Sequence, residues 1–220
     1  MLRPGLFHQM IWIDTIYSMI IVVTSLAIYL RTRELYELSD HKGIKYFSYT
    51  FLFFGASFFL RSLVHLFARL VDMPFFAFRH ELIFLLVFTG SMAVLSLLYS
   101  VLWKRFQEIP INPLIILTAF STIIAGATLI GRMRFFILLL QVLIFTVAII
   151  IGYIDYLKSK KGAHTRLFLL YSLLFFSWIA NVFAHFTTRL SLTIGLALYT
   201  ISTALFLLIL YSVLRITRVE

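Results

Sequence analysis

Seven runs of apolar residues, separated by short polar segments, follow one another along the 220-residue chain. A helix that crosses a bilayer needs about 20 predominantly apolar residues, and each run is about that long. The pattern predicts helices over residues 11–30, 46–70, 80–103, 112–131, 135–155, 167–189 and 192–214. We therefore predict an all-α integral membrane protein in which residues 1–220 form a single domain of seven transmembrane helices.

The composition favours the same class. Hydrophobic residues make up 62% of the chain, charged residues 13%, and the mean hydropathy is +1.01, whereas soluble domains are far richer in charge. Arg31 and Arg33, rather than a small-residue cleavage site, follow the first apolar run, so we expect a retained helix and not a removable signal. The chain contains no Cys, which excludes disulfides and thiolate metal sites.

The Lys and Arg residues predict the orientation of the chain. Twelve lie on one side of the predicted helices: Arg31, Arg33, Lys42, Lys45, Lys104, Arg105, Lys158, Lys160, Lys161, Arg166, Arg215 and Arg218. Six lie on the other side: Arg3, Arg69, Arg79, Arg132, Arg134 and Arg189. Because basic residues concentrate in cytoplasmic loops, we expect the N-terminus outside a cell membrane and the C-terminus in the cytoplasm. The net charge of +10 then favours anionic lipid headgroups as partners rather than nucleic acid.

Two stretches, SFFLRSLVHLFARL and SWIANVFAHFTTRL, align at an offset of 120 residues. The matched positions are Ser57 with Ser177, His65 with His185, Arg69 with Arg189 and Leu70 with Leu190, while Arg61 falls opposite Asn181. The preceding segments YELSDHKG and YLKSKKG, and the helix ends LLYSVLWKR and LILYSVLRITR, correspond in the same order. This order predicts a duplication, with repeat A at about 11–105, a linker helix at about 110–131 and repeat B at about 135–216.

A single linker helix gives both repeats the same orientation, so they are parallel repeats about an axis along the membrane normal. This 3+1+3 plan is similar to that of SWEET-type sugar carriers and, more loosely, of microbial rhodopsins. The chain lacks the Pro-Gln pair of the carriers, and residues 192–214 contain no Lys for a retinal Schiff base. The similarity therefore concerns architecture and carries over neither function.

Polar residues interrupt the second and sixth runs at every fourth position and so share one helix face. Counting 1.5 Å per residue from Tyr46, His65 lies roughly 28 Å along its helix, in the outer half of the bilayer. Other polar residues are expected at a similar level. The predicted layer consists of Arg61, His65, Arg69, Asn181, His185, Arg189, Asp14, Glu81 and Gln141.

Charged groups at membrane depth are costly, so they face a bundle interior, pair with each other or line a wet cavity. Structural interpretations are available: Arg69 and Arg189 can extend to the headgroups, Arg61 can pair with Asp14 or Glu81, and the histidines can form interhelical hydrogen bonds. The functional interpretation is a pocket between the repeats that binds a small anionic ligand, because guanidinium groups match carboxylates and phosphates. We expect aromatic walls from Trp12, Trp178, Phe58 and Phe59, and a carrier or receptor rather than an enzyme.

Two further functions are open. In a b-type membrane cytochrome, His65 and His185 would ligate a haem iron, and Arg61, Arg69 and Arg189 would hold its propionates. In a lipid-modifying enzyme, His65 or His185 would act with Asp14 or Glu81. A zinc site would also need these carboxylates, and G-x-S-x-G, H-E-x-x-H and Gly-rich phosphate motifs are absent.

The segment after the first run, RTRELYELSDHKGIK, mixes acidic and basic residues. The spacing of Arg33 and Glu37 predicts an i,i+4 ion pair and a helical extension of the first helix. The alternative for residues 31–45 is a docking surface for a cytoplasmic protein.

Overall fold

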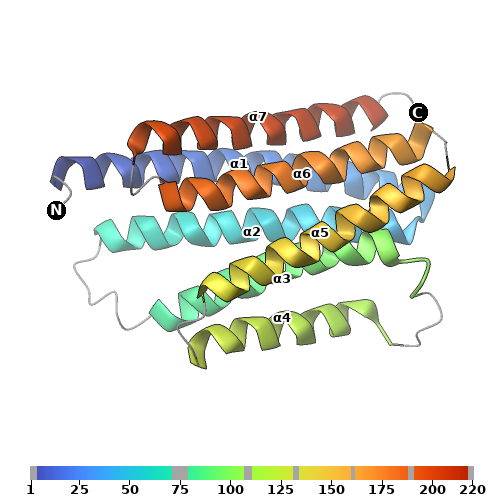
Figure 1. Cartoon of the computed structure of the whole chain (residues 1–220), viewed down its shortest axis with the longest axis horizontal. Helices are drawn as coiled ribbons and strands as arrows, with labels where there is room; N and C mark the ends of the chain where they lie inside the picture. Colours follow the sequence, from blue (N-terminus) through green and yellow to red (C-terminus); the bar gives the residue numbers. More distant parts are fainter. Residues whose placement is uncertain are drawn as a thin grey trace.

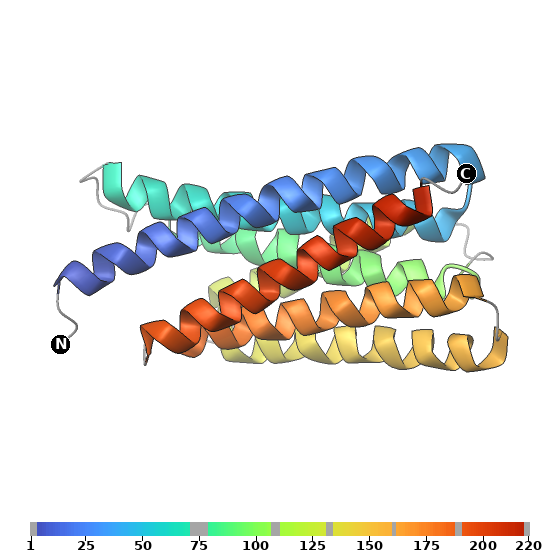
Figure 2. The ribbon, with the colours of Figure 1, turned by 90° about the horizontal axis from the view of Figure 1, so that it is seen from above.

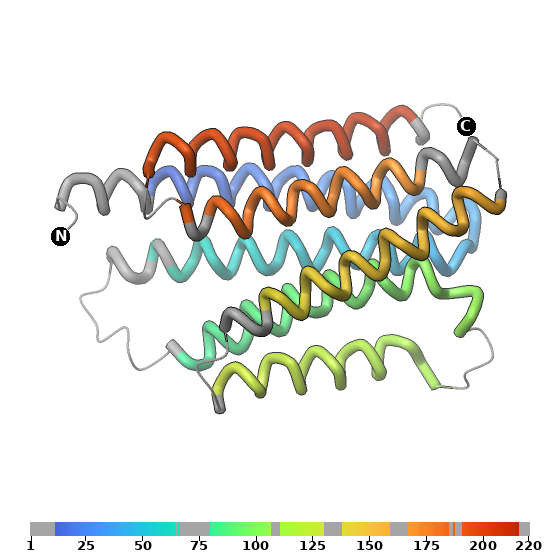
Figure 3. Tube along the Cα trace, in the orientation of Figure 1, coloured from blue at the N-terminus to red at the C-terminus, as the bar shows by residue number. Residues whose placement is uncertain are grey.

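The part of the chain that the structure describes forms a bundle of seven helices. The computed structural model describes residues 4–70, 79–106, 111–130, 134–159, 162–187 and 191–217. The helices are α1 (Pro4–Ser39), α2 (Lys42–Leu70), α3 (Arg79–Leu102), α4 (Pro113–Ile130), α5 (Arg134–Ser159), α6 (Gly162–Thr187) and α7 (Leu192–Thr217). They run along the long axis in alternating directions, with the N-terminus at one end and the C-terminus at the other (Figures 1 and 3). The predicted all-α architecture is confirmed for these residues.

Six helices are long and apolar enough to cross a membrane, which supports an integral membrane protein. These segments are Trp12–Ser39, Lys42–Val64, His80–Leu102, Leu138–Lys158, Leu167–Ala184 and Leu192–Arg215. The apolar segment of α4, Pro113–Leu129, is shorter. At 1.5 Å per residue the 18 residues of α4 extend about 27 Å, slightly less than a typical hydrocarbon core.

The mixed-charge segment after the first apolar run is helical, because α1 continues to Ser39. Arg33 Nε lies 3.0 Å from Glu37 Oε1, so the predicted ion pair is confirmed. Asp40 then adopts a positive φ of 47°, a conformation that Asp tolerates better than most residues and that ends helices. Its backbone N–H donates to the Tyr36 carbonyl at 2.8 Å, which closes the last turn of α1 before α2 begins.

The helices pack in an order that differs from their order in the chain. In addition to its neighbour α2, α1 packs against α7, and α3 packs against α5 as well as α4. Seen from above, α1 lies toward one edge of the bundle and α5 and α6 line the opposite edge, while α7 crosses from beside α6 to α1 (Figure 2). The first and last helices therefore close one side of the bundle.

Aromatic side chains fill the space between α2 and α6. Phe47, Phe51, Phe54 and Phe58 recur at helix spacing on one face of α2, and all four are buried. From this face, the ring of Phe54 lies 5.3 Å from that of Trp178, and the ring of Phe47 lies 5.6 Å from that of Tyr171. Because lipid is as apolar as this core, such packing contacts, rather than hydrophobic burial, hold the helices together.

α1 and α2 approach each other closely at Gly55. A Cβ atom at this position would lie 3.4 Å from Ser25 Cβ, at the tight end of normal contact. Both residues are buried. Small residues at such crossings let two helix backbones come together in a membrane.

We predict that Gly55→Leu lowers the melting temperature of the purified protein in detergent, because the larger side chain cannot fit against α1. The matched control is Gly126→Leu in α4, where a Cβ would meet no atom within 4 Å. The control should melt close to the wild type. Equal melting temperatures for the two variants would contradict the close α1–α2 crossing.

Candidate functional site

An ion pair between Arg61 of α2 and Asp14 of α1 lies inside the bundle. Arg61 Nε donates to Asp14 Oδ2 at 3.1 Å, and Nη2 donates to Asp14 Oδ1 at 2.5 Å. The two side chains are only 17% and 11% exposed. This two-pronged geometry is the strong form of a charge-assisted hydrogen bond. Sequence analysis proposed Asp14 as one of two partners for Arg61, and the structure brings these two residues together.

Two further helices complete the arrangement. The Tyr199 hydroxyl of α7 donates to Asp14 Oδ1 at 2.8 Å and accepts from Arg61 Nη2 at 3.1 Å. Arg61 Nη1 donates to Asn181 Oδ1 of α6 at 3.3 Å. We call Asp14, Arg61, Asn181 and Tyr199 the Arg61 cluster. It joins four helices, and its one cation and one anion balance each other.

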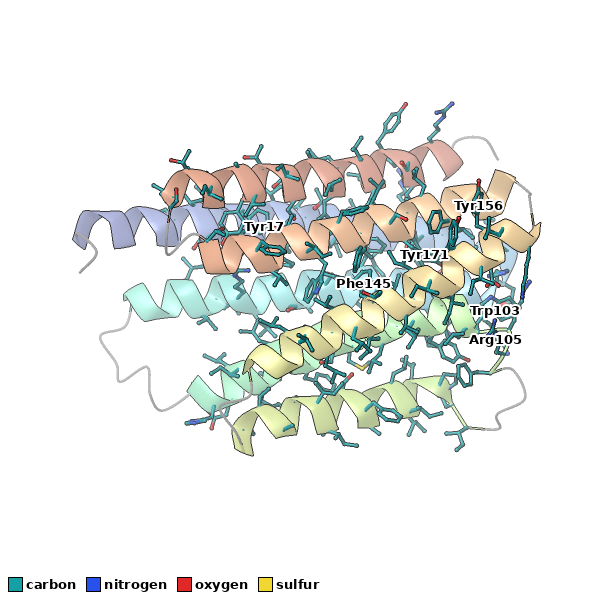
Figure 4. All side chains as sticks on the ribbon, viewed as in Figure 1. Tyr17, Trp103, Arg105, Phe145, Tyr156 and Tyr171 are labelled. Atoms are coloured by element: carbon teal, nitrogen blue, oxygen red, sulfur yellow. The ribbon has the colours of Figure 1, made fainter. Side chains whose placement is uncertain are left out.

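A second set of polar contacts adjoins the Arg61 cluster. The Tyr17 ring stacks on that of Tyr199 with 4.3 Å between centroids, and the Tyr17 hydroxyl lies 2.8 Å from Ser202 Oγ. Ser202 Oγ in turn lies 2.8 Å from Ser177 Oγ. Figure 4 shows Tyr17 of α1 beside α6 and α7. Hydrogen bonds thus continue from α1 across α7 to α6, through groups buried from solvent.

Helix periodicity explains how each element presents these groups. Side chains three or four residues apart lie on one face of a helix. The pairs are Asp14 and Tyr17 in α1, Phe58 and Arg61 in α2, Ser177 and Asn181 in α6, and Tyr199 and Ser202 in α7. The guanidinium carbon of Arg61 lies 5.9 Å from the Phe58 ring centroid, so an aromatic wall borders the cation.

Of the four aromatic residues predicted as walls, two lie inside the bundle. Phe58 and Trp178 are buried, whereas Trp12 and Phe59 are 49% and 44% exposed. Tyr17, Tyr199 and Ser202 were not among the predicted site residues, because single Tyr and Ser residues do not stand out in an apolar run. Their spacing on one face of α7, and the polar pair Asp14 and Tyr17 on α1, are the signals that identify them.

Two predicted site residues lie away from the Arg61 cluster. Gln141 of α5 is buried and its Nε2 donates to Ser91 Oγ of α3 at 3.2 Å. Glu81 is exposed in the first turn of α3. α3 packs against α2, α4 and α5 rather than against α1 or α7. The hydrogen bonds of Arg61 in the described part of the chain go to Asp14, Asn181 and Tyr199, and not to Gln141 or Glu81.

Four predicted residues fall outside the part of the site that can be described. His65 and Arg69 belong to α2 and His185 to α6, but their side chains lie outside the described residues, as does the whole of Arg189. Among the side chains that are described, no group of three or more His, Asp or Glu is arranged to hold a metal ion. Haem ligation by His65 and His185 stays a prediction from the sequence.

Seven buried polar atoms lack a hydrogen-bond partner among the described residues, and three of them lie close in the chain to members of the Arg61 cluster: Ser18 Oγ, Ser62 Oγ and Trp178 Nε1. Ser62 is next to Arg61 in the chain, Ser18 is one turn from Asp14, and Trp178 is three residues before Asn181. The three groups therefore lie within about one helical turn of the Arg61 cluster, on α1, α2 and α6. Buried donors without a partner are uncommon in native proteins and suit a bound polar molecule.

The opposite end of the bundle carries a titratable group of a different kind. His41 precedes α2, and its ring lies 4.5 Å from that of Trp103, edge to face. Burial lowers the pKa of His41, and the positive charge of Lys104 lowers it further. Trp103 and Arg105 follow the last residue of α3, Leu102, and lie close together in Figure 4. The neutral imidazole is favoured here, and it is remote from the Arg61 cluster.

The comparisons with known proteins give the chain a relative. An uncharacterized protein of Archaeoglobus fulgidus is 33% identical over 212 residues, covering 92% of this chain and 91% of the relative. The chain belongs to the family of this archaeal protein. No protein-family model and no solved structure matches the chain. The arrangement of side chains described above is therefore the basis for any functional proposal.

We predict that Asp14→Ala and Arg61→Met each destabilise the protein by about 3–5 kcal/mol, because each leaves a buried charge without its partner. The loss of unfolding free energy in the double variant should be clearly smaller than the sum of the losses in the two single variants, since it removes both charges. Denaturant unfolding of the four proteins in detergent measures this coupling.

The control pair is Arg33 and Glu37, whose side chains are 57% and 59% exposed. The same cycle with Arg33→Met and Glu37→Ala should give additive and small changes. Additive losses at Asp14 and Arg61 would mean that the two charges do not stabilise each other.

Proposed function

We propose that this protein is a carrier that binds a small carboxylate-bearing solute through Arg61, between α1, α2, α6 and α7. The observation that supports it most is the ion pair inside the membrane-spanning bundle. A guanidinium held there by an internal carboxylate is a ready recognition group, because a ligand carboxylate offers the same two oxygens as Asp14. In this proposal Asp14 occupies the ligand's place while the site is empty.

A purely structural ion pair is a poor explanation for this position. Charged groups within a membrane cost about 2.5–3.5 kcal/mol each on insertion scales, and replacing a buried pair by apolar residues is often neutral or stabilising. Membrane segments that retain such residues commonly use them for ligands, ions or protons. Arg61 and Asp14 fit this pattern because apolar residues surround them on all four helices.

The groups around the pair supply further donors. Tyr199 and Asn181 can bond to Arg61 and Asp14 or to a ligand, and Trp178 Nε1 and Ser62 Oγ have no partner among the described residues. Phe58 provides an apolar wall beside the guanidinium. A small solute with one carboxylate, a second polar group and a short apolar part matches this set.

Contacts between matched positions support the duplication. Arg61 and Asn181, which align at the offset of 120 residues, bond to each other. Residues related by a two-fold axis can touch only close to that axis. The packing has the same symmetry, since α1 packs against α2 and α7, while α5 packs against α6 and α3. On this view the Arg61 cluster lies at the repeat interface, where carriers of repeated architecture bind their solutes.

Two sets of polar contacts are also related by the proposed two-fold symmetry of the repeats. At the α6–α7 crossing, Ser177 and Ser202 hydrogen-bond to each other, and the Tyr17 hydroxyl of α1 hydrogen-bonds to Ser202. At the α2–α3 crossing, a Cβ on Gly90 would lie 3.8 Å from Ser57 Oγ and 3.5 Å from Gln141 Nε2 of α5. In the alignment of LLYSVL with the end of α7, Gly90 matches Ser202. Each crossing thus receives a polar side chain from the first helix of the other repeat.

The proposal includes the topology predicted from charge. All seven helices span a cell membrane, α4 being the shortest, and the N-terminus is outside. Asp14 and Arg61 lie about 14 Å of helix rise from the end of the bundle where α1 begins. The Arg61 cluster then belongs to the outer half of the bilayer, and the basic residues near residues 31–45 face anionic headgroups or a cytoplasmic partner.

We predict that liposomes containing the protein take up at least one of four radiolabelled carboxylates: acetate, lactate, succinate or benzoate. The variant to compare is Asp14→Asn with Arg61→Gln, which removes the guanidinium and its counter-charge together and so leaves no unpaired charge. It should retain the fold but lose uptake, because the recognition group is gone.

The matched control is Arg33→Gln with Glu37→Gln, which neutralises an exposed ion pair at the other end of α1. It should transport like the wild type. A carboxylate that raises the melting temperature without any flux would indicate a receptor instead of a carrier. If no carboxylate is transported or stabilises the protein, or if the Asp14/Arg61 variant transports normally, the proposal is wrong.

A further inference from the structure

The Arg61 cluster contains the parts of a proton-coupled site. We infer that Asp14 takes up one proton when a carboxylate ligand binds to Arg61, so that the solute and a proton enter the bundle together. This inference rests on the proposed function. It adds the coupling ion and the residue that carries it.

The charges of the Arg61 cluster balance before a ligand binds. In the described state one guanidinium and one carboxylate neutralise each other, with N–O distances of 2.5 and 3.1 Å. A ligand carboxylate that takes the same N–H groups adds a second negative charge to a site whose two ionic side chains are less than one-fifth exposed. A net charge at membrane depth is costly. One proton restores neutrality.

The neighbours of Asp14 make it the acceptor of that proton. α2 and α7 pack against α1, and among the described side chains Arg61 and the Tyr199 hydroxyl bond to Asp14 from them. Tyr17, one turn along α1, has its hydroxyl on Ser202 rather than on Asp14. Asn181 of α6 reaches the cluster through Arg61. Among the described members of the Arg61 cluster, Arg61 is thus the cation and Asp14 the carboxylate, while the side chains of His65 and His185 lie outside the described residues.

The proton transfer changes few bonds. Asp14 releases Arg61 Nε and Nη2 to the two oxygens of the ligand, and one Asp14 oxygen forms an O–H bond with a proton from the outer solution, where a buffer acid is left as its conjugate base. Asn181 Oδ1, which accepts from Arg61 Nη1 in the described state, is then an available acceptor for the new O–H. Tyr199 keeps its own hydroxyl proton and continues to donate to the other Asp14 oxygen.

His65 is the alternative proton carrier. It follows Arg61 by one helical turn in α2, and its side chain lies outside the described residues. An unperturbed imidazole titrates near pH 6.5, within the physiological range. The experiment therefore has to separate Asp14 from His65.

Isothermal titration calorimetry of the wild-type protein tests the inference without a variant. Acetate, lactate, succinate and benzoate are titrated at neutral pH, where these probes are ionised, in two buffers that differ in ionisation enthalpy. The difference in heat gives the number of protons taken up per ligand bound. We expect one, and an apparent affinity that weakens about tenfold per pH unit above neutrality.

Two variants assign the proton. Asp14→Asn mimics the protonated carboxyl, so it should bind the same carboxylate with no proton uptake and no dependence on pH. His65→Gln should still take up one proton. Proton uptake that persists in Asp14→Asn, or disappears in His65→Gln, would overturn the assignment.

The outcomes distinguish the two proposals. Binding by the wild type without proton uptake ends the coupling but leaves the carboxylate site intact. Binding of none of the four probes, by the wild type or by Asp14→Asn, contradicts the proposed function and the coupling together.

Discussion

The structure depends on one electrostatic constraint: a charge inside a membrane-spanning bundle must be matched where it lies. Arg61 is matched by Asp14, and this requirement brings α1 and α2 into a fixed relation at that level. Tyr199 and Asn181 then satisfy the remaining hydrogen-bonding groups and draw α7 and α6 to the same point. A single ion pair and its hydrogen-bond partners thus connect four of the helices, and a ligand of Arg61 would have to replace the contacts that Asp14 makes.

The rest of the bundle is held by contacts that do not depend on water. Aromatic rings interlock between α2 and α6, and α1 and α2 meet where Gly55 faces Ser25. Such packing is uniform along the helices, whereas the polar contacts are confined to a few levels. A change of charge in the Arg61 cluster would alter the contacts of four helices at once, and the proposed carrier function would use this property.

The sequence was sufficient to predict the helices, because runs of apolar residues of spanning length have few other interpretations. It also singled out Arg61, Asp14 and Asn181, since polar residues in such runs are conspicuous. It did not predict that Tyr17 and Tyr199 join them, because hydroxyl groups are common in helices and their partners depend on which helices meet. Nor did it show that Gln141 bonds to Ser91 of α3 or that Glu81 is exposed in the first turn of α3.

The central claim is that Asp14 is ionised inside the bundle because Arg61 is beside it. Infrared difference spectra of the wild type and Asp14→Asn, recorded in bilayers at neutral pH, test it directly. The account predicts that the substitution removes a carboxylate band, and that in an Arg61→Met background it removes the carbonyl band of a protonated acid instead. Loss of a protonated-acid band from the wild type, or of the same band in both backgrounds, would contradict it.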